Sequence, residues 1–208
     1  MSFPFYDSIE EIEIDGKIHE LSLCFGDVLR YFDLRRNPDG LSDKDIEEIA
    51  LSWFLPSLSY KAIGSEKASE IISRIEKDYI DIKKRKIASK KPQPKVVDFT
   101  FDSGYIYAAF MQVYGIDLYE QADVLHWRKF IYMFESLPED TAISQIMRIR
   151  AKEIDPKAKP EEIQRLSELK VLYALPDNGP AKKETGQSAL NGLFNYLYAK
   201  AKAGESIG

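Results

Sequence analysis

The chain has 208 residues, of which 44% are hydrophobic and 12% aromatic, and it carries a formal net charge of −5. This composition excludes an intrinsically disordered protein, and the longest apolar runs are shorter than the roughly 18 residues that a membrane span needs. A single cysteine, Cys24, excludes an internal disulfide and a thiolate zinc cluster, and the acidic N-terminus lacks the features of a signal peptide, so we expect a cytosolic protein.

A β-hairpin is predicted at residues 12–23. Asp15-Gly16 favours a two-residue turn, because both central positions of such a turn need a positive φ. This turn pairs Ile14 with Lys17 and sets the register of the two strands. The remaining pairs of this register are Ile12 with His19 and Glu10 with Leu21.

Three helices are predicted after the hairpin. The first ends at the Asn-Pro-Asp-Gly sequence of residues 37–40, and the second begins at Ser42 and stops at Pro56. Ser65 is the predicted cap of the third. The inward faces are Val28, Leu29 and Phe32 in the first helix, Ile46, Ile49, Ala50 and Trp53 in the second, and Ala68, Ile71, Ile72, Ile75 and Tyr79 in the third.

Residues 83–95 contain seven basic side chains, two prolines and no acidic side chain. The lysines repel one another and the prolines prevent a helix or a sheet, so we predict a basic Lys/Pro linker at 83–97. This linker would separate an N-terminal module of a hairpin and helices at 1–82 from a helical hub at 98–176. The predicted fold is therefore mainly α, with one small N-terminal β-hairpin.

The hub is predicted to begin with three helices. The first is apolar on both candidate faces, so we expect it to be buried on most sides. It closes at Gly115, which suits a left-handed conformation. The second starts near Asp123, a good N-cap residue, and stops at Leu137, and the third follows Asp140. Their apolar residues are Ile106, Tyr107, Ala109, Phe110, Met111, Val113 and Tyr114 in the first, Val124, Trp127, Phe130, Ile131 and Phe134 in the second, and Ile143, Ile146 and Met147 in the third.

Two more amphipathic helices are predicted towards the C-terminus. One begins at Pro160 and ends before Pro176, with Ile163, Leu166, Leu169 and Tyr173 on one side. Residues 177–208 form a loop and then a last helix at 188–204, which either folds back on the hub or binds another chain. The apolar stripe of this last helix is Leu190, Leu193, Phe194, Leu197 and Ala201.

No residue pattern in the sequence points to a catalytic, cofactor or metal site. The glycine spacing fits no nucleotide-binding loop, and His126 has no serine or cysteine signature that would supply a nucleophile. A structural histidine is therefore favoured over a general base, and we expect a protein that is not an enzyme.

The basic linker is open to three interpretations: a solvated connection, which we favour, a nucleic-acid contact without the usual stacking aromatics, or contact with an acidic protein surface.

Short motifs of the hub resemble one protein family. They are YIYAAF at 105–110, YGIDL at 114–118, LHW at 125–127 followed by Lys129-Phe130, then Leu137-Pro138 and Asp140-Thr141. The family is the small tail protein of long-tailed phages and prophages of Gram-positive bacteria that is encoded just before the tape-measure protein. Arg128 departs from the pattern, because the resemblance implies a second tryptophan at this position.

The resemblance implies a tail-assembly chaperone that binds the tape-measure protein and helps to recruit tail-tube subunits. Such a protein would act in the cytoplasm of the bacterial host and would be absent from the mature virion. The alternatives are a nucleic-acid-associated adaptor that uses the basic linker and a structural component of the finished tail, and self-association into a homo-oligomer stays open. The residues that we predict to contact partners are Leu190, Leu193, Phe194, Leu197, Tyr119, Tyr132 and Arg128.

Overall fold

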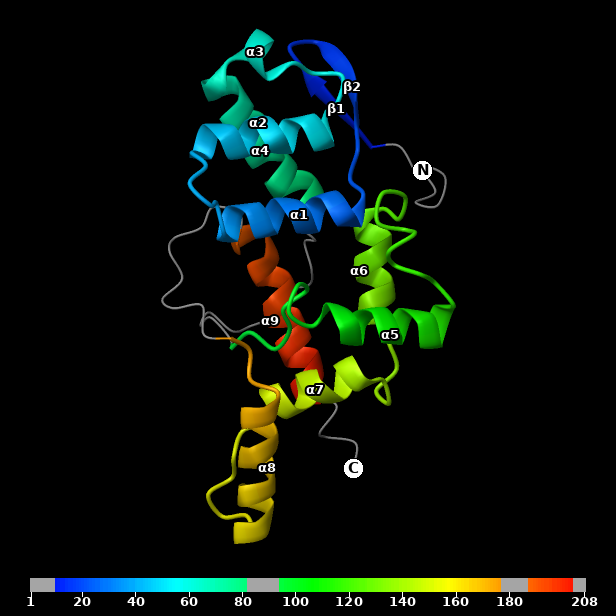
Figure 1. Ribbon diagram of the computed structural model, residues 1–208, viewed down its shortest axis with the longest axis vertical. Coiled ribbons are helices and arrows are strands. Elements are labelled where there is room, and N and C mark those ends of the chain that lie inside the picture. Colours follow the sequence, from blue (N-terminus) through cyan, green and yellow to red (C-terminus); the bar gives the residue numbers. More distant parts are fainter. Residues whose placement is uncertain (1–9, 82–93, 177–186, 204–208) are drawn as a thin grey trace. The chain divides into compact units, whose positions relative to one another are not determined.

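The computed structural model describes residues 10–81, 94–176 and 187–203, and for 187–193 it describes the backbone alone. The chain divides into two compact units. Figure 1 labels the helices and strands. Among the described residues, unit 1 comprises 10–81, 119–132 and 187–189, and unit 2 comprises 94–118, 133–176 and 190–203. The predicted fold class is confirmed, because the chain is mainly helical and has a small N-terminal β-hairpin.

The hairpin of unit 1 has the predicted register. Strands β1 (Glu10–Ile14) and β2 (Lys17–Leu21) pair antiparallel, with Ile14 opposite Lys17. Asp15 and Gly16 have φ values of 50° and 76°, as the two-residue turn requires. Ile12, Ile14 and Leu21 are buried, so one face of the hairpin contributes to the core of unit 1.

Four helices and a π-helical turn follow the hairpin. They are α1 (Phe25–Arg36), α2 (Asp43–Phe54), α3 (Tyr60–Ile63), α4 (Ser65–Ile75) and η1 (Glu76–Ile80). Ser42 and Asp45 form a complete capping box at the start of α2, in which each side chain bonds the other residue's backbone N–H. The N-cap of α4 is Gly64 and not the predicted Ser65, which is the first helical residue.

The buried face of α2 is turned away from the predicted one. Ile46 and Ala50 are buried as predicted, but Ile49 and Trp53 are only partly covered. Leu51 and Phe54 are buried in their place. The reason is that α2 packs against both α1 and α4, and the ring of Phe54 meets that of Tyr31 on α1 edge-on at 5.5 Å.

A second stretch of chain, residues 119–132, belongs to unit 1. Its backbone pairs with the segment that joins β2 to α1: Phe25 donates to the carbonyl of Leu125 at 2.9 Å, and Trp127 donates to that of Leu23 at 2.8 Å. Helix α6 (Trp127–Glu135) therefore begins at Trp127, four residues later than predicted. Val124 lies before the helix and is 70% exposed, so its predicted inward placement is wrong.

Trp127 is the largest fully buried side chain of unit 1. Its indole nitrogen donates to the carbonyl oxygen of Ile80 at 3.1 Å, which satisfies the polar end of the ring. Phe130, one turn further along α6, stacks on Phe25 with ring centroids 4.6 Å apart. The apolar series predicted for this helix is thus buried from Trp127 onwards.

Unit 2 contains the C-terminal residues of α6 and four further helices. These are α5 (Ser103–Tyr114), α7 (Ala142–Ala151), α8 (Pro160–Leu172) and, from residue 190 onwards, α9 (Gln187–Ala203). Gly115 ends α5 in the left-handed conformation, with φ 66° and ψ 25°, as predicted. The expectation that α5 is buried on most sides is wrong, because Tyr105 and Met111 are exposed and only Ile106, Ala109 and Phe110 are buried in this helix.

The start of the described part of unit 2 is packed rather than solvent-facing. Val96 and Val97, which the sequence places in the predicted linker at 83–97, are both fully buried. Most of the basic run at 83–95 lies outside the described residues, so the linker and the domain ranges drawn around it stay predictions.

Candidate functional site

The described part of the chain offers no group of three or more His, Cys, Asp or Glu side chains that could hold a metal ion. Among the same residues, no helix combines the length and the apolar character that crossing a membrane requires. We consider first the residues that the sequence predicts to contact partners.

These predicted contact residues are divided between the two units. In unit 1, Tyr119 and Tyr132 are exposed and Arg128 is partly buried. In unit 2, the side chain of Leu197 is only 1% exposed, and that of Phe194 is partly covered. Leu190 and Leu193 belong to α9, and their side chains lie outside the described residues. The partner contacts of all seven residues stay predictions.

Arg128 takes part in a polar cluster of unit 1. Its guanidinium lies 3.2 Å from the carboxylate of Glu10, and its backbone N–H donates to Nδ1 of His126 at 3.2 Å. The other ring nitrogen of His126 lies 3.8 Å from Glu10. Because Nδ1 accepts a hydrogen bond, the neutral ring carries its proton on Nε2, which faces the Glu10 carboxylate.

Burial sets the protonation of this cluster. It lowers the pKa of His126 to about 4, and the positive charges of Arg128 and Lys129 act in the same direction. Burial raises the pKa of Glu10, and the charge of Arg128 opposes that change. At neutral pH the ring of His126 is therefore uncharged.

An open apolar groove lies between α7 and α8 in unit 2. We call it the α8 groove, and it has a volume of about 410 Å³. The residues that line it are Arg148, Ile149, Lys152, Glu153, Ile154, Asp155, Ala158, Glu162, Ile163, Arg165, Leu166 and Leu169. Its apolar wall on α8 is the predicted stripe Ile163, Leu166 and Leu169.

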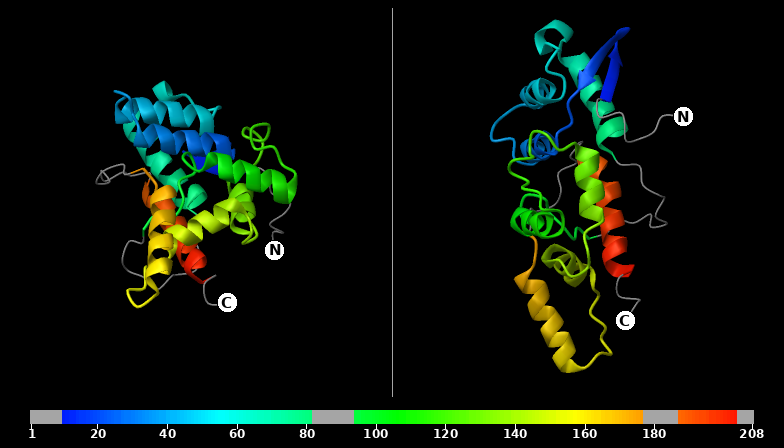
Figure 2. Two further views of the ribbon diagram at one scale, coloured as in Figure 1. Left: turned by 60° about the horizontal axis from the view of Figure 1, so that its bottom comes forward. Right: turned by 90° about the vertical axis from the view of Figure 1, so that its right-hand side faces the viewer.

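Local sequence explains why α8 forms without a buried face. Pro160 occupies the first turn with Glu161 and Glu162, whose negative charges suit a helix N-terminus. No residue of α8 is buried, and Figures 1 and 2 show the helix extending beyond α7. Two large apolar residues at its end are exposed: Val171 by 78% and Leu172 by 71%. Exposed apolar surface of this extent at the end of a helix is typical of a binding site.

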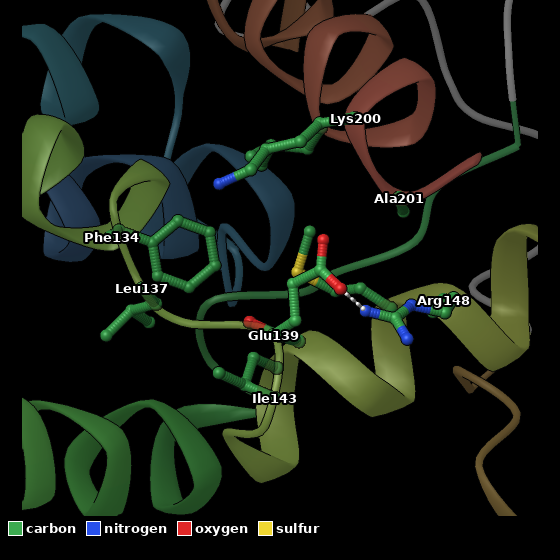
Figure 3. Close-up of a pocket in the computed structure, with 10 residues that line it drawn as sticks. Phe134, Leu137, Glu139, Ile143, Arg148, Lys200 and Ala201 are labelled. Carbon is green, nitrogen blue, oxygen red and sulfur yellow. Dashed lines mark hydrogen bonds and ion pairs between the residues drawn. The ribbon is translucent and has the colours of Figure 1, made fainter. Parts of the chain in front are cut away.

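A second, smaller apolar site lies under α9 (Figure 3). We call it the α9 pocket, and its volume is about 60 Å³. Leu197, Lys200 and Ala201 of α9 form one side of it. The residues on the other sides are Phe134, Leu137, Glu139, Ile143, Ser144, Met147 and Arg148. Figure 3 shows the ion pair of Glu139 with Arg148, at 2.7 Å, among these lining residues.

The outer side of α5 is a third surface, and the expectation that this helix is buried on most sides missed it. Phe101, Tyr105 and Met111 are exposed there. The sequence contained a signal: residues 103–116 include no charged side chain, although 30% of the whole chain is charged. Exposed aromatic and Met side chains without neighbouring charges are enriched at protein interfaces.

Comparisons with known proteins give one match. A family model described as "Bacteriophage Gp15 protein" matches residues 5–175 of the chain. Neither the curated proteins nor the solved structures gave a match. The matched range includes the α8 groove and the outer side of α5, and it ends before α9.

Proposed function

Because the chain belongs to the bacteriophage Gp15 protein family, we propose that it is a non-enzymatic tail-assembly chaperone. In this role it binds the tape-measure protein and helps to recruit tail-tube subunits. It acts in the cytoplasm of the bacterial host and is absent from the mature virion. The family match supports a phage protein, and the tail motifs at residues 105–141 support the more specific role.

The α8 groove is the observation that carries the proposal. A chaperone for a long helical protein must cover apolar stripes, and an amphipathic helix fits an apolar groove through residues spaced three and four apart. The α8 groove offers Ile163, Leu166 and Leu169 on its wall, at intervals of three residues along one side of α8. Charged side chains of both signs surround the groove, including Lys152 and Glu162. Because this rim is not a large apolar surface, a bound helix can also be released into solvent.

Exposed apolar residues at the end of α8 allow a test that leaves the fold intact. The double variant Val171→Asp with Leu172→Asp should weaken co-purification with the tape-measure protein by at least about tenfold, since two apolar contacts are replaced by charges. Both positions are more than two-thirds exposed. The matched control is Ile18→Asp with Val124→Asp in unit 1, where the exposed fractions are 69% and 70%.

The outcomes separate the proposal from its alternatives. Loss of binding in the α8 variant alone supports a contact at α8, whereas equal retention of both variants assigns the contact to another surface. If the wild-type chain retains no part of the tape-measure protein, the chaperone proposal is wrong. Retention on nucleic acid at physiological salt would then favour the adaptor that uses the basic linker, and presence in purified virions would favour a structural tail component.

A further inference from the structure

Helix α9 of unit 2 lies in an apolar groove, and it fills this groove incompletely. We propose that this groove is a second docking site for an amphipathic helix of the tape-measure protein, and that α9 is its removable internal occupant. The identity of the partner rests on the proposed function. The existence of the docking site rests on the contacts described below.

The floor of the groove comes from elements that precede α9 in the chain. Phe134 at the end of α6, Ile143 and Met147 on α7, and Leu137 between these helices form an apolar surface. Phe99 extends this surface, with its ring edge-on to Phe134 at 5.4 Å. All five residues lie within the range of the family match, whereas α9 lies beyond it.

Helix α9 occupies this floor with the spacing of a groove-bound helix. Phe194, Leu197, Tyr198 and Ala201 stand at positions i, i+3, i+4 and i+7, which is one face of an α-helix. Leu197 and Tyr198 are buried, and Phe194 lies 6.3 Å from Phe99 between ring centroids. The charged end of Lys95 lies 5.2 Å from the Phe194 ring.

Ala201, the fourth position of this face, leaves part of the groove unfilled. Ala201 is the smallest of the four side chains, and it lines the α9 pocket of about 60 Å³ (Figure 3). Ile143 and Met147 also line this pocket. Unfilled space next to apolar side chains forfeits the contacts that a larger residue would make. A helix with leucine or methionine at this position would therefore bind the groove more tightly than α9 does.

The rim of the groove indicates the charge of its ligand. Lys200 donates to the carbonyl oxygen of Glu135, and Lys202 pairs with Glu153 at 2.7 Å. The carbonyl oxygen of Glu135 and the carboxylate of Glu153 therefore accept from the basic side chains of the helix that lies in the groove. The expected ligand is an amphipathic helix with a bulky i, i+3, i+4, i+7 face and basic residues beside its last apolar position.

A peptide with the sequence of residues 187–203 tests the docking site without any phage partner. The full chain is prepared with Leu197→Asp, which places a charge at a 1% exposed position and should release its own α9. We expect a fluorescent peptide to bind this variant at least about tenfold more tightly than it binds the wild-type chain, whose groove is occupied. The matched control variant, Ala203→Asp, adds the same charge at an exposed position of α9 and should behave as wild type.

A second substitution works in the opposite direction and does not depend on releasing α9. Ala201→Leu in the peptide should tighten binding by about tenfold, because three further carbon atoms enter the pocket. Ala201→Leu in the full chain should hold α9 in place, raise the melting temperature and reduce peptide binding. If Leu197→Asp gives no gain in peptide binding and Ala201→Leu changes neither affinity nor melting temperature, the docking site is refuted.

A competition measurement separates this inference from the proposed function. Tape-measure fragments should displace the peptide from the Leu197→Asp chain. If the fragments bind the chain without displacing the peptide, the proposed function stands and the assignment of this groove to the tape measure is wrong. If the peptide binds but no fragment binds anywhere on the chain, the groove is a docking site and the chaperone proposal fails.

Discussion

Asp102 and Arg150 form a bidentate ion pair that joins the start of α5 to the end of α7 across 48 residues of sequence. The two guanidinium nitrogens of Arg150 donate to the two carboxylate oxygens at 2.6 and 2.8 Å. The Nε of Arg150 also donates to the carbonyl of Tyr173, just after α8, at 2.6 Å. Arg150 thus joins α5, α7 and the end of α8. Helix α8 forms one wall of the α8 groove.

Removing the acid of this pair should destabilise the protein strongly. Asp102 is fully buried and the Arg150 side chain is 7% exposed, so Asp102→Ala leaves a buried guanidinium without its counter-charge. We expect a loss of about 3–5 kcal/mol in the free energy of unfolding, measured with denaturant. Asp102→Asn keeps an oxygen acceptor and should lose less. A loss below about 1 kcal/mol in Asp102→Ala would show that the pair does not hold these elements together.

Two neighbouring residues at the start of α6 should differ in their effect on stability. Trp127→Ala removes a fully buried ring and its bond to Ile80, and we expect it to cost about 3–5 kcal/mol. Arg128→Ala removes a partly exposed contact with Glu10 and should cost about 1 kcal/mol. Equal losses in denaturant unfolding would mean that the helix register at this position is wrong.

Gly26 and Gly104 provide a matched pair of glycine substitutions. A Cβ at Gly26 would lie 2.7 Å from the carbonyl oxygen of Ala122, where residues 119–126 approach α1, so Gly26→Ala should cost about 1–3 kcal/mol. A Cβ at Gly104, in the first turn of α5, would meet nothing within 4 Å. Gly104→Ala should therefore stabilise the protein by up to about 1 kcal/mol. Thermal unfolding of the two variants in opposite directions is the expected result, and destabilisation by both would contradict it.

The protonation of His126 should make stability depend on pH. Its pKa is about 4 in the folded chain and 6.5 when unperturbed, so the unfolded chain binds the proton first as the pH falls. The stabilisation is complete above about pH 6.5 and is lost progressively as the pH falls towards about 4. Glu10 acts in the opposite direction, because burial raises its pKa and favours the protonated acid in the folded chain.

A conservative variant separates the effect of His126 titration on stability from the effects of Glu10, Arg128 and Lys129. His126→Asn retains an acceptor near the position of Nδ1 for the N–H of Arg128, and it does not titrate. Between about pH 7.5 and pH 5, wild-type stability should fall relative to this variant, by at most about 1.4 kcal/mol per pH unit. A stability difference that stays constant over this range would refute the role of His126.

Local signals in the sequence predicted much of the fold. Asp15-Gly16 predicted the hairpin and its register, Ser42 the start of α2, and Gly115 the end of α5, because each acts through its own backbone conformation or a neighbour within a few residues. The late start of α6 could not be found in this way. It depends on the pairing of Leu125 and Trp127 with Leu23 and Phe25, about a hundred residues away in sequence.

The candidate site was harder to predict than the fold. The apolar stripes of α8 and α9 are similar in sequence, yet Leu197 of α9 is buried while no residue of α8 is. Periodicity identifies an apolar face but not whether the chain itself covers it. The hydrogen bond from Arg150 to the carbonyl of Tyr173 helps to set the position of α8, in which its apolar face stays open. No local sequence signal predicts this hydrogen bond.

The solubility of the tape-measure protein tests the central claim most directly. The tape-measure gene is expressed alone, with the wild-type chain, and with the chain carrying Val171→Asp and Leu172→Asp, and the soluble fraction of tape-measure protein is measured by centrifugation. We predict that most of it is soluble only with the wild-type chain, because the α8 groove covers its apolar stripes. A soluble fraction that the wild-type chain does not raise above that of the tape-measure protein expressed alone would contradict the chaperone function.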